Sequence, residues 1–124
     1  KLLKRVQSQL FDIGADLCKP YLKENENRFE DQIKFLETEL DNLNKDLNSL
    51  TSFILPGGTV ASAFLHLSRT TIRRAERTIV DLLEFEEVNP TLLQYINRLS
   101  DFLFVAARFE NKKEGDILWV PNKN

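Results

Sequence analysis

Residues 59–85 read TVASAFLHLSRTTIRRAERTIVDLLEF, and this stretch decides the fold class. It contains neither proline nor glycine, so it predicts one uninterrupted helix from Val60 to about Phe85, roughly seven turns long. Thr59 immediately precedes this helix. It can serve as the N-cap, because its hydroxyl oxygen can accept a hydrogen bond from a backbone N–H of the first turn.

Three further helices are predicted around this one by apolar residues at steps of three and four. The first helix carries Leu3, Val6, Leu10, Ile13 and Leu17. It ends near Pro20, because proline disfavours helical backbone in the residue before it. The second carries a bundle seam of Ile33, Leu36, Leu40, Leu43, Leu47 and Leu50. The last begins with Asn89 as N-cap and Pro90 in its first turn, and runs to about Asn111.

No stretch alternates between apolar and polar residues with a period of two, so no strand is expected. The sequence therefore predicts an all-α, up-down helical bundle forming a single domain over 1–124. The polar segment 23–28 is expected to be a loop, and the tail 116–124 is expected to be extended. The opening at Lys1 already lies inside a helical pattern without a cap, so we expect a further N-terminal segment before it.

The composition excludes several classes of protein. With 124 residues, 42% of them hydrophobic, the chain can build one core. A net charge of −2 predicts neither a nucleic-acid partner nor an anionic membrane surface, and no apolar run approaches the roughly 20 residues of a membrane span. The single cysteine, Cys18, excludes an internal disulfide and fits a reducing compartment, so a cytoplasmic location is expected.

The long helix carries the most informative polar residues. Arg69, Arg73 and Glu76 fall at positions i, i+4 and i+7, so they share one face. Two arginines beside a carboxylate form a cationic fork suited to phosphate oxygens. The alternative is a solvated charged face with structural ion pairs, and the spacing alone does not choose between them.

The last helix offers a second set of polar side chains. Asn97, Asp101 and Arg108 recur at helical spacing and are expected to face one wall of a site. Buried polar groups need partners, so they form either a core network or ligand contacts. The nearby aromatic residues are more typical of a core than of a cofactor site: Phe102, Phe104 and Phe109.

Other chemistries find no support. His66 is the only histidine, which argues against a zinc site built on several histidines, and it is more typical of a packed helix residue. No Glu-x-x-His pair is present for a di-iron bundle. The turn 56–58, Pro-Gly-Gly, lacks the Gly-Lys-Ser/Thr ending of a phosphate-binding P-loop.

Taken together, these segments resemble the ATP:cob(I)alamin adenosyltransferases. The resemblance rests on Phe53-Ile-Leu-Pro-Gly-Gly-Thr59, on Arg73-Arg-Ala-Glu-Arg77 preceded by His66 and Arg69, on Asn97-Arg-Leu-Ser-Asp101, and on residues 9–17. It covers nearly the whole chain. It implies a five-helix bundle that forms a homotrimer, with active sites between subunits, and a reaction in which cob(I)alamin takes the 5′-deoxyadenosyl group of ATP, accompanied by Mg²⁺, and triphosphate leaves.

The resemblance also implies roles for individual residues. Arg73 is expected to bind ATP phosphates, Glu76 to orient it or to bind the nucleotide through the metal, and Asn97 to hydrogen-bond the nucleotide. Arg69 is expected to make an intersubunit ion pair beside the corrinoid. Phe104 is expected to line the corrinoid pocket. Catalysis is thus assigned to Arg69, Arg73 and Glu76.

Phe53 is expected to lie under the corrin ring, where it would displace the lower axial ligand of cobalt and ease reduction to Co(I). The alternative is a hydrophobic staple that packs on the first turn of the following helix. The family's N-terminal phosphate loop and its Asp-Glu-Leu-Asn-like segment are absent from these 124 residues. A catalytically inactive helical trimer that binds corrinoid, or a purely structural one, therefore remains an alternative.

Overall fold

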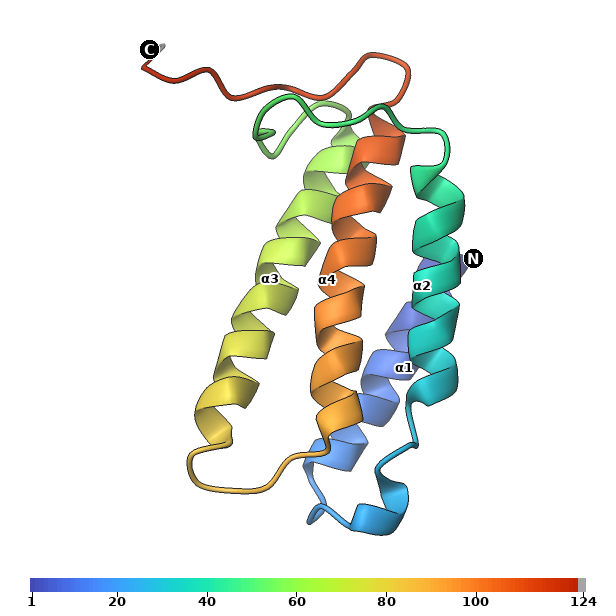
Figure 1. The fold of residues 1–124 in the computed structure, drawn as a ribbon, viewed down its shortest axis with the longest axis vertical. Helices are drawn as coiled ribbons and strands as arrows, with labels where there is room; N and C mark the ends of the chain where they lie inside the picture. The colour runs from blue at the N-terminus through green and yellow to red at the C-terminus, as the bar shows by residue number, and fades with distance from the viewer. Residues whose placement is uncertain (123–124) are drawn as a thin grey trace.

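The computed structural model describes residues 1–122 and confirms the all-α class (Figure 1). Its α-helices are α1 (Leu2–Leu17), α2 (Glu30–Asn44), α3 (Val60–Leu82) and α4 (Pro90–Glu110). The expected loop at 23–28 contains a short 3₁₀ helix, Lys23–Asn25. The only β-pairing within the described residues is an isolated bridge between Ile54 and Leu118. None of the helices in this part of the chain combines the length and apolar character that crossing a bilayer requires.

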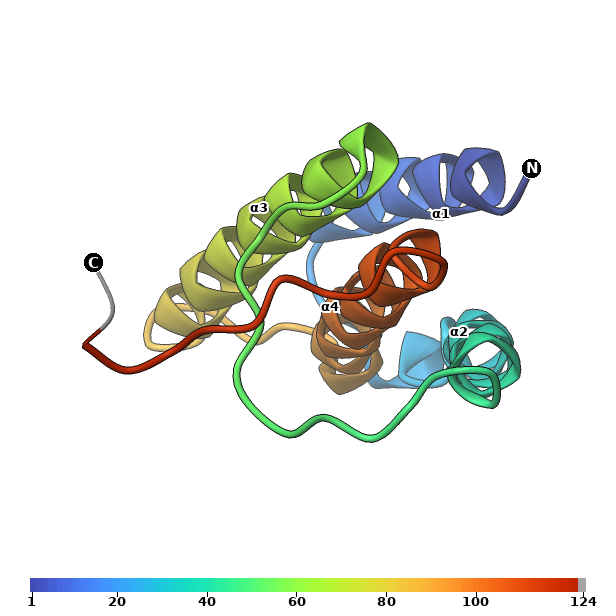
Figure 2. The same cartoon turned by 90° about the horizontal axis from the view of Figure 1, so that it is seen from above.

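Helix α4 is the centre of the bundle. It packs against α3 on one side and α2 on the other, and Figure 2 shows it lying among the other three helices. It also supplies much of the core, including Leu92, Tyr95, Ile96, Leu99, Phe102 and Leu103. The hydroxyl of Tyr95 donates a buried hydrogen bond of 2.7 Å to Oε1 of Gln9, which ties α1 to α4.

Both predicted helix starts are confirmed. The hydroxyl of Thr59 accepts a hydrogen bond of 3.1 Å from the N–H of Ser62, at the start of α3. The Oδ1 atom of Asn89 accepts one of 3.0 Å from the N–H of Thr91, with Pro90 in the first turn of α4. These local signals succeed because a cap needs only its own first turn.

The predicted length of the second helix is wrong. Helix α2 ends at Asn44, so Leu47 and Leu50 lie outside it although they continue its leucine spacing. The physical reason is a contact from the far end of the chain. The Arg108 guanidinium donates a hydrogen bond of 2.7 Å to the carbonyl of Asn48. This bond holds the segment after Asn44 across the end of the bundle, so the segment does not continue α2.

Two extended segments close that end of the bundle, at the top of Figure 1. The loop between α2 and α3 and the tail after α4 run side by side. The N–H of Leu55 donates to the carbonyl of Ile117 at 2.7 Å, and the N–H of Trp119 donates to the carbonyl of Phe53 at 2.8 Å. The predicted extended tail is thus confirmed for residues 116–120. Residues 121–122 form a turn instead, and 123–124 lie outside the described residues.

The turn that leads into α3 is fastened by one buried amide. Oδ1 of Asn111 accepts from the N–H of Thr59 at 2.9 Å, and its Nδ2 donates to the carbonyl of Gly57 at 2.8 Å. Between them, Gly58 has a φ of +103°, and a Cβ added there would collide with the side-chain amide of Asn111. The turn therefore requires glycine at 58 for both backbone conformation and space.

We predict that Gly58→Ala lowers the free energy of unfolding by at least about 2 kcal/mol, because it adds backbone strain and displaces the Asn111 amide from its two partners. Gly14→Ala is the matched control. Gly14 lies within α1, where an added Cβ would have no other group within 4 Å, so alanine there should stabilise the protein by about 1 kcal/mol. Urea unfolding of both variants measures the two changes in the free energy of unfolding. Equal changes would contradict the requirement for glycine at position 58.

Candidate active site

The polar face of α3 meets α4 through a hydrogen-bonded network. The guanidinium of Arg73 donates to Oε1 of Glu76, and the side-chain amide of Asn97 donates to Oε2 of the same carboxylate at 2.9 Å. Arg98 in turn donates to Oδ1 of Asn97 at 3.1 Å. The three residues expected to bind ATP are therefore brought together across two helices, with Glu76 between the other two.

This network presents a fixed cation at the surface. The Glu76 side chain is only 14% exposed and has both carboxylate oxygens occupied, whereas the Arg73 side chain remains 43% exposed. Charge-assisted hydrogen bonds of this kind orient a guanidinium while leaving its other N–H donors for a ligand. Glu76 thus contacts the Arg73 guanidinium directly, and its expected role in orienting that group stays a prediction.

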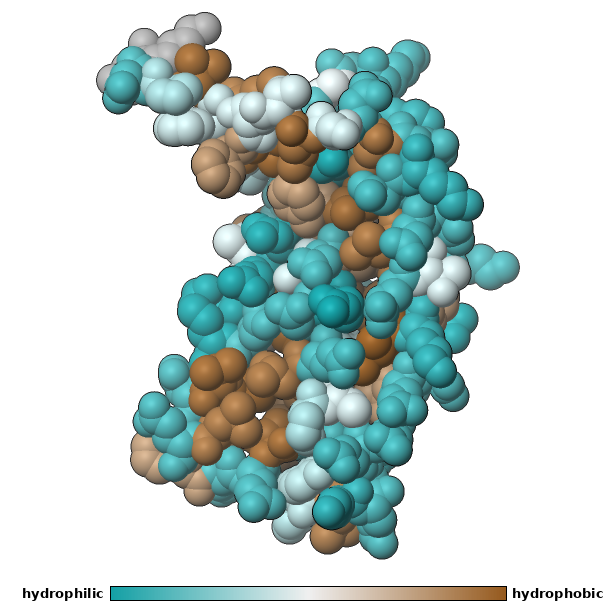
Figure 3. All heavy atoms as spheres, in the orientation of Figure 1, coloured by the Kyte–Doolittle hydropathy of each residue, from teal (hydrophilic) through white to brown (hydrophobic). Residues whose placement is uncertain are grey.

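A cleft opens beside the network. It has a volume of about 460 Å³ and is lined by Glu76, Leu83, Val88, Pro90, Leu93, Gln94 and Asn97. Figure 3 shows an apolar area over the lower ends of α3 and α4, surrounded by polar surface. An apolar cleft with a few polar groups at one end suits a ligand that has a flat apolar part and a polar or charged part.

A second cleft lies further toward the loop end of the same helix pair. Its volume is about 280 Å³, and its lining comprises Ile54, Pro56, Ala63, His66, Leu67, Arg69, Thr70 and Phe104. The Arg69 guanidinium lies over the Phe104 ring, 5.2 Å from its centroid, and the His66 ring meets Phe104 edge-on at 6.2 Å. The structure therefore brings together Arg69 and Phe104, the two residues that the resemblance places beside the corrinoid, and their role toward it stays a prediction.

Two polar atoms of this second cleft lack a partner. Nε of Arg69 and Nε2 of His66 are both buried and make no hydrogen bond within residues 1–122. Buried polar atoms without partners are costly in a finished structure, and they point to a group that completes the site.

Phe53 lies on the loop beside this second cleft. Its ring is 78% exposed and meets the Trp119 ring edge-on, with 5.9 Å between centroids and 68° between planes. A staple would be buried against the first turn of α3, so that alternative is wrong.

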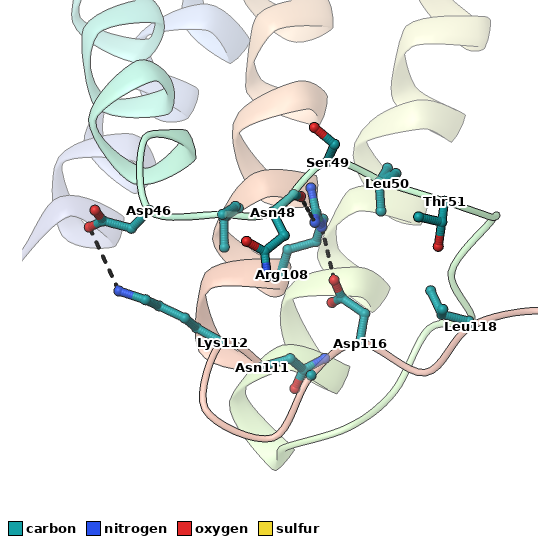
Figure 4. Close-up of a pocket in the computed structure, with 12 residues that line it drawn as sticks. Asp46, Asn48, Ser49, Leu50, Thr51, Arg108, Asn111, Lys112, Asp116 and Leu118 are labelled. Atoms are coloured by element: carbon teal, nitrogen blue, oxygen red, sulfur yellow. Dashed lines mark hydrogen bonds and ion pairs between the residues drawn. The ribbon is translucent and has the colours of Figure 1, made fainter.

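Asn97, Asp101 and Arg108 do not form one wall, and that prediction is wrong. Asp101 is exposed and pairs with Arg98 at 3.4 Å. Arg108 lies about two turns beyond Asp101 along α4. It is nearly buried, and its Nε donates to Oδ2 of Asp116 at 2.9 Å (Figure 4). The cause is the C-terminal tail, which folds back to supply Asp116.

Of the three aromatic residues that were more typical of a core, only Phe102 is buried, whereas Phe104 and Phe109 are partly exposed. Phe102 belongs to the core, whereas Phe104 points into the second cleft. Sequence reasoning missed Asp116 and assigned no role to Trp119. No helical spacing connects either residue to the site, so only the fold could reveal them.

The surroundings of His66 in the second cleft favour the neutral form of its imidazole. Burial lowers the pKa of its imidazole below the usual value of about 6.5. The nearby Arg69 guanidinium lowers that pKa further, whereas the Asp116 carboxylate opposes both effects. The side chain therefore resists protonation in the folded protein.

Comparison with known proteins shows what this arrangement belongs to. The family model for cobalamin adenosyltransferase matches residues 1–110. A corrinoid adenosyltransferase of Bacillus subtilis is 42% identical over 113 residues, which is 91% of this chain and 58% of the relative. The corrinoid adenosyltransferase of Homo sapiens is 37% identical over 98% of this chain and 51% of its own length.

Solved structures agree in fold. A variant of a PduO-type ATP:corrinoid adenosyltransferase from Lactobacillus reuteri, complexed with cobalamin and ATP, superposes with a TM-score of 0.85 at 40% identity, over 98% of this chain and 68% of the other. A second variant, complexed with ATP, superposes with a TM-score of 0.81 at 38% identity, over 95% of this chain and 69% of the other. The described bundle thus has the PduO-type helical fold. The chain belongs to the cobalamin adenosyltransferase family.

The lowered pKa of His66 predicts a specific dependence of stability on pH. Below about pH 6.5 the unfolded chain binds a proton at this imidazole before the folded chain does, so the free energy of unfolding falls as the pH falls. We expect His66→Gln to lose this contribution. Urea midpoints at about pH 7.5 and pH 5 should therefore differ less in the variant than in the parent protein. An unchanged difference would contradict a lowered pKa of His66 in the folded protein.

Proposed function

We propose that the protein transfers the 5′-deoxyadenosyl group of ATP to the cobalt of cob(I)alamin, forming adenosylcobalamin and releasing triphosphate. One observation carries this proposal. The Arg73–Glu76–Asn97 network and the Arg69–Phe104 cleft lie in succession on the same pair of helices. An anion-binding site adjoins an aromatic cleft there, as a reaction between a nucleotide and a macrocycle requires. The names of the relatives and the ligands of the Lactobacillus structure support the same conclusion.

On the nucleotide side, Arg73 binds phosphate oxygens of ATP. Glu76 keeps its guanidinium in place, and Asn97 hydrogen-bonds the nucleotide. Triphosphate leaves as a polyanion, so a fixed cation stabilises the transition state more than it stabilises bound ATP. A guanidinium already oriented by a carboxylate needs little reorganisation during the reaction.

On the corrinoid side, Arg69 and Phe104 line the pocket for the macrocycle. The buried Nε of Arg69, which finds no hydrogen-bond acceptor in the described residues, is completed by an acidic group of a neighbouring subunit. Phe53 presents an exposed apolar ring from the adjacent loop. In the proposal this ring takes the place of the lower axial ligand, so that cob(II)alamin becomes four-coordinate and accepts an electron more readily.

The transfer step is a nucleophilic displacement. An electron pair of Co(I) forms the bond to C5′ of the ribose, the C5′–O bond breaks, and its electron pair leaves with the triphosphate. Cobalt ends as Co(III). The reaction needs the metal, the carbon and the leaving oxygen in line, and groups fixed on two packed helices can hold that geometry.

Magnesium enters this proposal with ATP, coordinated by its phosphates. The described residues do not fit a metal site held by the protein alone, because they contain no cluster of three His, Cys, Asp or Glu side chains. Both oxygens of Glu76 are already occupied by Arg73 and Asn97. We therefore assign no step to a metal bound by this chain.

We also propose a homotrimer with active sites between subunits. Its support is an exposed apolar stripe on α3, formed by Val60, Phe64 and Leu67 at positions i, i+4 and i+7. A continuous stripe of large apolar side chains on a helix is typical of an interface. The free, exposed cysteine, Cys18, favours a cytoplasmic location.

We predict that Arg73→Ala lowers kcat/KM for ATP by about 10- to 100-fold, because one charge-assisted contact to phosphate is lost. The matched control is Arg28→Ala. Arg28 forms an ion pair with Asp16 at 3.1 Å, outside the Arg73–Glu76–Asn97 network. The side chains of Arg28 and Asp16 are 45% and 14% exposed, and those of Arg73 and Glu76 are 43% and 14% exposed. Steady-state kinetics of the full-length protein should distinguish Arg73→Ala from Arg28→Ala. Unchanged kinetics in Arg73→Ala would refute its role, and corrinoid binding without any transfer by the parent protein would indicate a carrier.

For the assembly, we expect light scattering at micromolar concentration to give a trimer mass. Phe64→Lys, which places a charge in the middle of the stripe, should shift the mass to that of the monomer. Lys34→Glu on the exposed face of α2 reverses a charge without touching the stripe, and it should leave the trimer intact. A parent protein that is monomeric under these conditions would refute the proposal.

A further inference from the structure

We infer that Trp119 is a positioning residue for Phe53, acting through the C-terminal tail. This inference deepens the proposed function and rests on it, because it assumes that the Phe53 ring contacts the corrinoid. The Phe53 ring is mostly exposed to solvent, so some other part of the chain must fix its position. Both residues of the contact that we describe lie outside the four helices.

The backbone of Phe53 is held by the tail. Its carbonyl accepts a hydrogen bond of 2.8 Å from the N–H of Trp119, and the hydroxyl of Ser52 donates to the carbonyl of Trp119 at 2.8 Å. On the other side, the N–H of Leu55 donates to the carbonyl of Ile117 at 2.7 Å. Three hydrogen bonds thus bracket Phe53 within four residues, and all of them come from the segment around Trp119.

The tail itself is fixed to the bundle. Asp116, which begins this segment, pairs with the nearly buried Arg108 guanidinium at 2.9 Å. The same guanidinium donates to the carbonyl of Asn48 at 2.7 Å, so one side chain of α4 fastens both the loop and the tail (Figure 4). A nearly buried, hydrogen-bonded ion pair of this kind resists local opening more than an exposed pair does.

The ring of Phe53 has one identified aromatic neighbour. It meets Trp119 edge-on, at a centroid distance of 5.9 Å, which lies within the favourable range for aromatic pairs. Without that neighbour, a ring that is 78% exposed can occupy several χ1 rotamers. A ring that must occupy the axial position of cobalt works best when it is preorganised, because freezing its rotamers on binding costs free energy.

Spectroscopy of bound cob(II)alamin tests this inference. We expect Trp119→Ala to lower the four-coordinate fraction and kcat by roughly two- to tenfold, the range that one edge-to-face pair contributes. The KM for ATP should stay unchanged, because the proposed phosphate-binding residue, Arg73, lies on α3 and not on the loop or the tail. Trp119→Phe should restore most of the four-coordinate fraction. Val120→Ala, an exposed neighbour in the same tail, should have no effect.

The double variant distinguishes positioning from an independent role. If Trp119 acts through Phe53, then Phe53→Ala with Trp119→Ala should resemble Phe53→Ala alone. Additive losses would overturn the inference. So would a normal four-coordinate fraction in Trp119→Ala while Phe53→Ala loses it, although the proposed function would then stand. If Phe53→Ala keeps the four-coordinate signal, the proposed role of Phe53 fails, and the inference fails with it.

The contact also has a readout that needs no substrate. Trp119 is the only tryptophan in the sequence, so its fluorescence reports on this one ring. Phe53→Ala should shift the emission to longer wavelength, because water replaces the aromatic neighbour. Phe85→Ala removes an equally exposed ring at the opposite end of α3 and should leave the emission unchanged. An unchanged emission in Phe53→Ala would overturn the inference.

Discussion

The arrangement of the α2–α3 loop and of the C-terminal tail depends on the Arg108 guanidinium. It is nearly buried at the C-terminal end of α4, where the helix dipole favours a cation. It bonds the carboxylate of Asp116 and the carbonyl of Asn48, which belong to segments far apart in sequence. Because both segments meet at this charge, the loop that carries Phe53 and the tail that carries Trp119 are placed side by side. Removing the cation would leave a nearly buried carboxylate without its partner, which is costly.

The helical part imposes a complementary constraint. Both clefts are built on α3 and α4, and Glu76 on one helix is hydrogen-bonded to Asn97 on the other. The positions of the proposed nucleotide and corrinoid sites are therefore fixed by one helix–helix interface. Close packing along such an interface permits only small shifts, which suits a reaction between two bound molecules.

How much the sequence can predict follows from the range of the interactions involved. Thr59 and Asn89 are predictable as caps because their partners lie within the next three residues. Arg73 and Glu76 are predictable as neighbours because helical spacing alone brings them together. The end of α2 could not be predicted, because it is set by a contact between Asn48 and Arg108, 60 residues apart. The partner of Arg108 could not be predicted either, because Asp116 reaches it only when the tail folds back. Local patterns carry no information about such contacts.

The amide of Asn111 has a chemical consequence. Its oxygen faces an N–H and its nitrogen faces a carbonyl, so the site accepts a side chain with one donor and one acceptor in that order. Deamidation would replace the nitrogen by a second acceptor and place a negative charge against the carbonyl of Gly57. The side chain would keep its shape but lose its hydrogen bond to the carbonyl of Gly57. Deamidation of this one amide would thus loosen the turn before α3 without altering any residue of the proposed active site.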